Sequence, residues 1–84
     1  MIKVLYFASL REQVGRGNED VDLPAGVNTV AAVRALLVQR GGAWQTALAQ
    51  GRALRVAVNQ DMAHAATPVR PGDEVAFFPP VTGG

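Results

Sequence analysis

The 84-residue chain contains no cysteine, so a single small hydrophobic core has to hold its fold together. A chain of this length buries only about 60–65% of the surface that it exposes when unfolded, and most of its apolar residues are therefore needed in that core. We predict one domain over residues 1–84, since a second domain has no room. The lack of cysteine also excludes disulfides, thiolate metal sites and a cysteine nucleophile.

Strand patterns lie at both ends of the chain. Residues 1–7 alternate in polarity, and Lys3 marks one face of this segment as accessible to solvent. The opposite face carries the predicted core residues Ile2, Val4 and Tyr6. Residues 74–78 form the last predicted strand, which ends before two prolines because proline has no N–H to offer to a sheet ladder.

The strand patterns between these two segments are weaker. Residues 52–59 alternate like a half-buried strand, and a short strand is expected near Met62. Residues 15–20 are polar and predict a loop, followed by a strand at 20–23.

The strongest helix pattern follows Asn28 and Thr29, either of which can cap it. Arg40 is expected in its last turn, where a positive charge suits the negative end of the helix dipole, and Gly41 and Gly42 are expected to end it. The apolar positions at helical spacing are Val30, Val33, Leu36 and Leu37.

Shorter helices are predicted at 8–14 and 43–50. The resulting order is strand, strand, helix, strand, short elements and strand. This order predicts an α+β domain in which one main helix packs across one face of a mixed sheet.

Charge and hydropathy argue against several classes of function. Eight basic and seven acidic residues give a net charge of +1, without the basic stripe of a nucleic-acid-binding protein. No apolar run approaches the roughly 18 residues of a membrane span, and the N-terminus does not resemble a signal peptide. We therefore expect no nucleic acid and no membrane as partners, and a cytoplasmic location.

Catalytic and metal-binding patterns are weak. His64 has no second histidine or cysteine to complete a ligand set, so no metal site is expected and His64 is predicted to lie at the surface. Gly15-Arg16-Gly17 resembles part of a phosphate-binding loop, but it follows a predicted helix and lacks the remaining glycine spacing. Neither feature predicts an active site in this chain.

The C-terminal residues are more informative. Two glycines at the end of a chain occur by chance in roughly one chain in two hundred. The prolines stiffen the start of the segment 79–84, which we expect to be a flexible tail reaching about 17 Å when extended. Glycine has no Cβ, so an enzyme tunnel can close around the end of such a tail. Once joined to AMP, its α-carboxylate becomes an acyl group that sulfide, thiol or amine can attack.

Several segments together resemble a known family. The ending Phe77-Phe78-Pro79-Pro80-Val81-Thr82-Gly83-Gly84 follows Gly72-Asp73-Glu74-Val75. The opening VLYFA with Arg11-Glu12, the helix start Thr29-Val30 and the segment Val58-Asn59-Gln60 match as well. With these features the chain closely resembles the small subunits of molybdopterin synthase, over nearly its whole length except 15–20 and 43–51.

The resemblance implies a β-grasp, ubiquitin-like fold and a role as sulfur carrier rather than as a catalyst on its own. Gly84 would be adenylated, converted to a thiocarboxylate and used as sulfur donor to a pterin precursor in molybdenum cofactor biosynthesis. No cofactor would be bound permanently, and ATP would be consumed by a separate adenylating enzyme. The large synthase subunit would bind the precursor, in a heterotetramer of two small and two large subunits.

The same resemblance implies roles for individual residues. The tail residues Pro80, Val81, Thr82 and Gly83 would thread into the partner, and Arg11 and Met62 would contact it. The strand pattern itself predicts that Phe7 and Phe78 form an exposed apolar patch near the tail if the first and last strands lie side by side. The alternative is that both rings belong to the core.

Two other functions stay open. A sulfur carrier for thiamine or another thio-compound would share the two glycines, although such carriers tend to be shorter and to lack the YFA and Arg-Glu opening. A ubiquitin-like modifier joined to target lysines, or a pure binding module, is the second alternative, because an acyl adenylate also reacts with amines.

Overall fold

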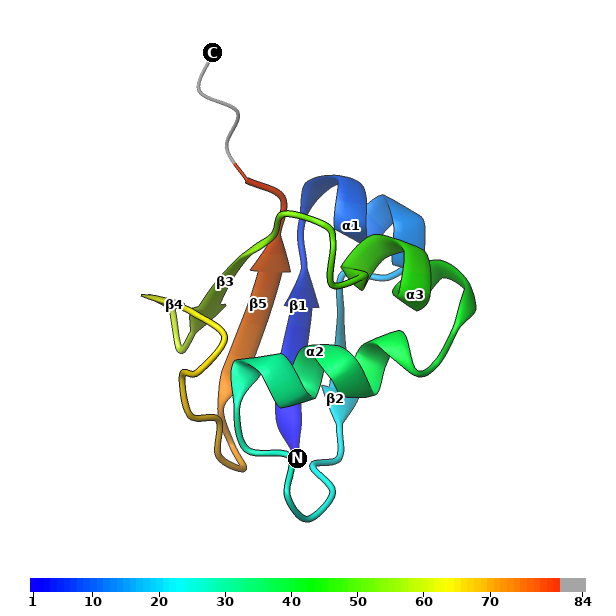
Figure 1. Cartoon of the computed structure of the whole chain (residues 1–84). Coiled ribbons are helices and arrows are strands. Elements are labelled where there is room, and N and C mark those ends of the chain that lie inside the picture. Colours follow the sequence, from blue (N-terminus) through cyan, green and yellow to red (C-terminus); the bar gives the residue numbers. More distant parts are fainter. Residues whose placement is uncertain (81–84) are drawn as a thin grey trace.

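The computed structural model describes residues 1–80 of the chain. Helices and strands follow one another as β1 (Ile2–Tyr6), α1 (Ala8–Val14), β2 (Asn18–Val21), α2 (Val30–Val38), α3 (Gly42–Leu48), β3 (Arg55–Val58), β4 (Asp61–Ala63) and β5 (Glu74–Phe78) (Figure 1). None of the helices within these residues is long and apolar enough to cross a membrane.

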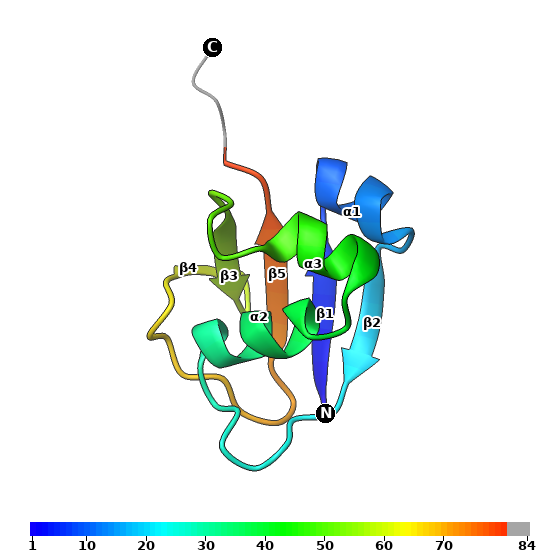
Figure 2. The same cartoon turned by 45° about the vertical axis from the view of Figure 1, so that its right-hand side comes forward.

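The strands form one mixed sheet in the order β2-β1-β5-β3-β4. The central strands β1 and β5 are parallel, and the other neighbours are antiparallel. Two parallel strands need a crossover connection, and α2 and α3 lie within it, both on the same face of the sheet (Figures 1 and 2). This arrangement is the β-grasp fold, and it confirms the α+β class with α2 packed across one face.

The core lies between the sheet and the helices. The alternation read in β1 is confirmed, because Ile2, Val4 and Tyr6 are at most 1% exposed. Val33 and Leu37 of α2 meet this layer and are fully buried. Each such aliphatic side chain stabilises the fold by about 1.5–3 kcal/mol relative to an exposed position.

The start of α2 agrees with the sequence, but its end does not. Thr29 caps the helix, because its Oγ1 accepts a hydrogen bond from the Ala32 N–H at 3.2 Å. The helix ends at Val38, so Arg40 lies outside it. The N–H groups of Arg40 and Gly41 bond to carbonyls three residues earlier, and these tight turns close the helix before the glycines are reached.

Gly41 and Gly42 serve the next helix instead of ending α2. Gly41 is the N-cap of α3 with a φ of 74°, and Gly42 opens α3 with a φ of 54°. Both values lie in the left-handed region that glycine adopts easily. The two glycines thus form the turn that leads from α2 into α3.

Strand β2 also differs from the prediction, since it spans 18–21 rather than 20–23. Asn18 pairs with Leu5, and the carbonyl of Gly17 accepts the N–H of Tyr6 at 2.9 Å. Residues 18–20 therefore belong to the sheet, and only the first part of the expected loop at 15–20 is correct. Their polar side chains gave no strand pattern in the sequence, because an edge strand needs few apolar residues.

Strand β3 begins at Arg55 rather than at Arg52 because the preceding segment is held by a helix. The Arg34 guanidinium on α2 donates to the carbonyls of Leu48, Ala49 and Arg52, with a length of 2.7 Å to Leu48. Of these three residues only Arg52 lies in the segment predicted as a strand, and its carbonyl is bonded to Arg34 rather than to a neighbouring strand. Burial lowers the pKa of Arg34.

Candidate functional site

The face of the sheet opposite α2 and α3 is not covered by a helix in the described chain (Figures 1 and 2). The register aligns Leu5 with Ala76, Ala76 with Ala57, and Ala57 with Met62, so an apolar row crosses four strands. The row next to it is polar, because Lys3 lies beside Glu74. We call this surface, with Phe7 and Phe78, the open face.

Phe7 and Phe78 meet at the end of the open face where β5 finishes. Their ring centroids are 6.4 Å apart in a T-shaped arrangement. Phe7 is 48% exposed and Phe78 is half-buried, while Met62 at the far side is 61% exposed. The prediction of adjacent, accessible rings is confirmed, and the alternative of two core rings is wrong. An apolar surface of this kind is typical of a protein interface.

The backbone around Phe7 is firmly held. Its N–H donates to the Phe77 carbonyl at 3.2 Å, and its own carbonyl accepts from Leu10 at 3.1 Å. The next residue, Ala8, has a φ of 52° in the left-handed region, which costs a residue with a Cβ about 1–2 kcal/mol. This turn directs the chain sharply from β1 into α1.

Arg11 lies exposed on α1. A Cβ added to Gly17 would come within 3.3 Å of the Arg11 Nε, so the glycine leaves room for the guanidinium. Gly15 ends α1 with a φ of 77° and donates its N–H to the Arg11 carbonyl at 3.0 Å. The Gly-Arg-Gly segment is therefore a helix end rather than a phosphate-binding loop.

The tail begins where β5 ends. Pro79 is half-buried and Pro80 is exposed, directly after Phe78 and at the end of the molecule opposite the N-terminus (Figure 1). The remaining predicted site residues, Val81, Thr82, Gly83 and Gly84, lie outside the described residues.

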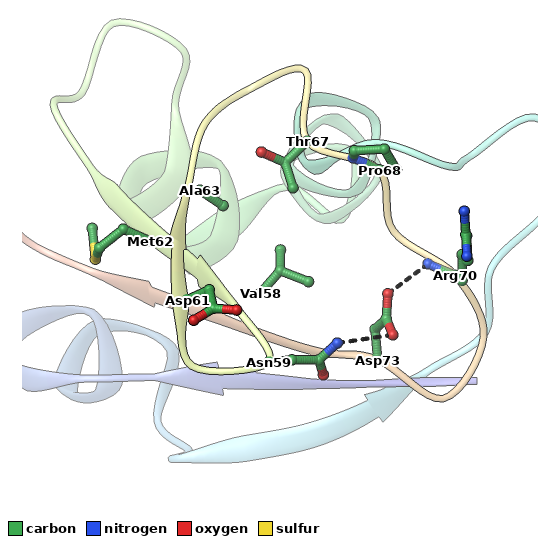
Figure 3. A pocket seen from close by; sticks show the side chains of 9 residues that line it. All are labelled: Val58, Asn59, Asp61, Met62, Ala63, Thr67, Pro68, Arg70 and Asp73. Carbon is green, nitrogen blue, oxygen red and sulfur yellow. Dashed lines mark hydrogen bonds between the residues drawn. The ribbon is translucent and has the colours of Figure 1, made fainter.

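A polar pocket of about 350 Å³ lies between the β3–β4 hairpin and the segment before β5 (Figure 3). Asp73 accepts hydrogen bonds from the Arg70 N–H at 2.9 Å and from the Asn59 side chain at 3.1 Å. These bonds, the one from Arg70 first, lower the pKa of the Asp73 carboxyl group. The polar groups of the pocket thus fix two turns, and within residues 1–80 no cluster of three potential metal ligands occurs.

A second polar cluster connects the edge of the sheet to the helices. The Tyr6 hydroxyl donates to Glu19 at 2.8 Å, and Trp44 Nε1 donates to Tyr6 at 3.1 Å. Arg40 bonds to Glu19 at 2.8 Å and lies 5.0 Å above the Trp44 ring. Burial, with the bond to Glu19, raises the pKa of Tyr6 far above its ordinary value, so its hydroxyl stays protonated. This cluster joins elements and offers no reactive group.

Sequence reasoning found the residues of the open face but missed both the cluster around Glu19 and the Arg34 contacts. His64 lies at the surface as predicted, where its Nδ1 accepts from the Ala66 N–H. The candidate site in the described residues is thus the apolar open face beside the start of the tail. Its chemistry depends on what the tail carries.

Comparisons with known proteins agree with this reading. A model of the ThiS family matches residues 4–84. The molybdopterin synthase sulfur carrier subunit of Escherichia coli (strain K12) is 46% identical over 84 residues, which cover all of both chains. The crystal structure of small archaeal modifier protein 1 from Haloferax volcanii superposes with a TM-score of 0.75 at 27% identity, over 95% of this chain and 97% of that chain.

A chain from the complex of subunits 1 and 2 of the molybdopterin-converting factor of Helicobacter pylori shares the fold, with a TM-score of 0.66 at 24% identity over 99% of this chain and 97% of that one. The family match spans nearly the whole sequence, and the Escherichia coli relative aligns with it from end to end. This chain therefore belongs to the ThiS family.

Proposed function

We propose that this chain is the sulfur carrier subunit of a molybdopterin synthase and acts in molybdenum cofactor biosynthesis. The observation that carries the proposal is the 46% identity, over the full length of both chains, with the Escherichia coli sulfur carrier subunit. The apolar open face beside the tail supports it, because a carrier has to dock and present its end to other proteins.

Gly84 would carry the sulfur. Its carboxylate would first form an anhydride with AMP, with pyrophosphate released from ATP by an adenylating enzyme. Sulfide from a sulfur donor would then attack the acyl carbon, so that a C–S bond forms and AMP leaves with the electron pair of the broken C–O bond. The resulting thiocarboxylate sulfur would attack the pterin precursor, and hydrolysis would return the carboxylate. Two such transfers would build the dithiolene.

The large subunit of the synthase would dock on the open face, in contact with Phe7, Arg11, Met62 and Phe78. Pro80, Val81, Thr82 and Gly83 would then thread towards its active site, where the precursor is bound. We propose an assembly of two small and two large subunits, and no cofactor held permanently by this chain. The steps consume ATP, which fits a cytoplasmic location.

The test is the intact mass of the chain purified from cells that make the cofactor. A fraction should be heavier by the difference between sulfur and oxygen, with the change confined to the terminal peptide. No cysteine is present to mimic this mass. In a reconstituted reaction the change should require ATP and the adenylating enzyme, and a chain without Gly84 should not show it.

The likeness to a small archaeal modifier protein favours protein conjugation as a second candidate function. If the unmodified mass persists with ATP, sulfur donor and adenylating enzyme present, while lysine-linked adducts on other proteins appear, the carrier proposal falls and the modifier function replaces it. If the chain were a sulfur carrier for thiamine, deletion of its gene would create a thiamine requirement and leave the molybdenum enzymes active.

A further inference from the structure

Arg55 is a charged residue on the open face, beside the start of the tail. It is the first residue of β3 and pairs with Phe78, the last residue of β5. Its neighbour Val56 belongs to the buried core, so alternation along the strand places Arg55 on the opposite face, together with Ala57. Side chains directly opposite each other in antiparallel strands have Cβ atoms about 4.5–5.5 Å apart. Arg55 and Phe78 are therefore direct neighbours on the open face.

The described chain supplies no carboxylate partner for Arg55. Within residues 1–80, ion pairs occur only at Glu19, on the edge strand β2. Lys3, which lies at the other end of the open face, is flanked in the strand register by Asp20 and Glu74. Arg55 is exposed and has no such neighbours in its own register. Its positive charge is balanced by solvent alone in this part of the chain.

The position of Arg55 is part of a wider separation of charge along the sheet. Strands β1 and β5 run towards the tail, and β2 and β3 run away from it (Figure 1). The charged residues at the tail end are mostly basic: Arg11, Arg16, Arg52 and Arg55, beside the acidic Glu12. Those at the opposite end are mostly acidic: Asp20, Asp22, Asp61, Asp73 and Glu74, beside Lys3 and Arg70. Among the described residues, the tail end is thus positive and the other end negative.

A partner that covers Phe78 also covers Arg55, its direct neighbour. Removing a guanidinium group from water is costly unless a new acceptor replaces the lost hydration. A carboxylate is the acceptor that best matches the planar donors of arginine. Since the described chain places none beside Arg55, the partner has to supply it.

We propose that Arg55 pairs with a carboxylate of the large subunit, in an acidic rim around the entrance that receives the tail. Attraction between the positive end of this chain and the acidic rim turns the tail towards the entrance before contact is made. The ion pair then fixes how the sheet is oriented on the partner. This inference rests on the proposed function, because it takes the large subunit as the partner of the open face.

The experiment compares Arg55→Gln with a matched control, Arg70→Gln. Both substitutions remove the positive charge of an exposed arginine, but Arg70 lies at the end away from the tail. A third variant, Arg55→Lys, keeps the charge. Stopped-flow mixing with the large subunit measures the association and dissociation rate constants at ionic strengths of about 0.02 M and 0.5 M, between which screening becomes strong. Urea unfolding checks that each chain is folded.

At low ionic strength Arg55→Gln should associate about three- to fivefold more slowly than the natural chain, and most of this difference should vanish at high ionic strength. It should also dissociate at least about tenfold faster, because the carboxylate of the partner is left without a counter-charge. Arg55→Lys should associate as fast as the natural chain. Arg70→Gln should leave both rate constants close to their natural values.

Equal slowing of association by Arg55→Gln and Arg70→Gln would overturn this inference, because only the net charge would then matter. Unchanged rate constants for Arg55→Gln, or faster association, would overturn it as well, since the rim would not be acidic. Both results leave the proposed function standing. If the natural chain itself does not bind the large subunit, the proposed function fails, and the inference falls with it.

Discussion

Phe78 is the residue at which the packed fold and the open face meet. It is the last residue of β5, it packs edge to face against Phe7, and the prolines of the tail follow it. Its ring is partly buried and partly accessible on the open face.

Replacing Phe78 with alanine should therefore harm binding more than folding. Truncation of a half-buried ring should lower the free energy of unfolding by about 1–2 kcal/mol. Loss of an aromatic anchor from the proposed interface should weaken large-subunit binding by about 2 kcal/mol or more, roughly 30-fold in Kd. Urea unfolding and calorimetric titration measure the two effects.

Leu36→Ala is the control for this prediction, because Leu36 is a half-buried apolar residue on α2, away from the open face. It should lose comparable stability and keep its affinity. A Phe78→Ala protein whose melting temperature collapses, while its folded fraction binds as tightly as before, would contradict the prediction.

Individual residues of the open face could be predicted, whereas the polar contacts could not. Phe7 and Phe78 follow from strand alternation, which is a local pattern. Trp44 and Tyr6 are 38 residues apart, and Arg34 reaches Arg52 over 18 residues. Contacts of this kind have no period in the sequence, and they appear only when the elements are packed.

At the scale of elements, Glu19 connects β2 to β1 and to the segment between α2 and α3. Its carboxylate on β2 accepts from Tyr6 of β1 and from Arg40 before α3. Burial by itself would raise the pKa of Glu19, but the bonds from Arg40 and Tyr6 outweigh it and lower the pKa. Ionised Glu19 is thus favoured by the folded state.

Glu19→Gln should lower the free energy of unfolding at pH 7 by about 1–2 kcal/mol, because a charged acceptor binds more strongly than an amide. A lowered folded pKa means that the stabilisation is present above the unfolded value of about 4.3 and is lost as the pH falls through the folded value. The two proteins should therefore differ in urea unfolding at pH 5–7, and the difference should shrink as the pH falls below the unfolded value. A difference that does not shrink on acidification would show that the carboxylate charge is not responsible.

The limits of elements were predictable only where a local signal marks them. Thr29 starts α2 and the prolines end β5, as their side chains dictate. The beginnings of β2 and β3 depend on distant hydrogen bonds, and the end of α2 is set by backbone bonds of Arg40 and Gly41 that no side chain marks. The strand pairing that extends β2 to Asn18 and the Arg34 contacts that delay β3 are tertiary effects.

At the scale of the whole molecule, the sheet has a covered face and an open face, and the tail starts at one end of both. Because the two faces are separate, substitutions on the covered face should change stability, and substitutions on the open face should change how the tail is presented. The order of elements along the sequence predicted the class of fold. The strands that pair with β5 could be identified only from the structure, because sequence order does not fix which strands pair.

Insertion of one alanine between Gly83 and Gly84 should leave the unfolding of the chain unchanged, since the packed core lies within residues 1–80. The insertion lengthens the tail by about 3.3 Å. A displacement of 1 Å at a reacting atom can already lower a rate about 100-fold, so sulfur transfer to the precursor should fall by at least that factor. Single-turnover transfer from a loaded chain measures it.

A Thr82→Ala chain, which keeps the length of the tail, is the control for the insertion and should transfer at a rate close to that of the natural chain. Full transfer by the lengthened chain would mean that the tail is not held in a tunnel of fixed depth.

The last strand along the chain is not at an edge of the sheet but in its middle, bonded to β1 on one side and β3 on the other. Any mechanical force applied to the tail therefore enters the sheet through β5. Such a pull loads the hydrogen bonds to both neighbours at once, in shear, instead of peeling an edge strand away one bond at a time. A pull on the end of β5 is therefore resisted by two neighbouring strands rather than by one.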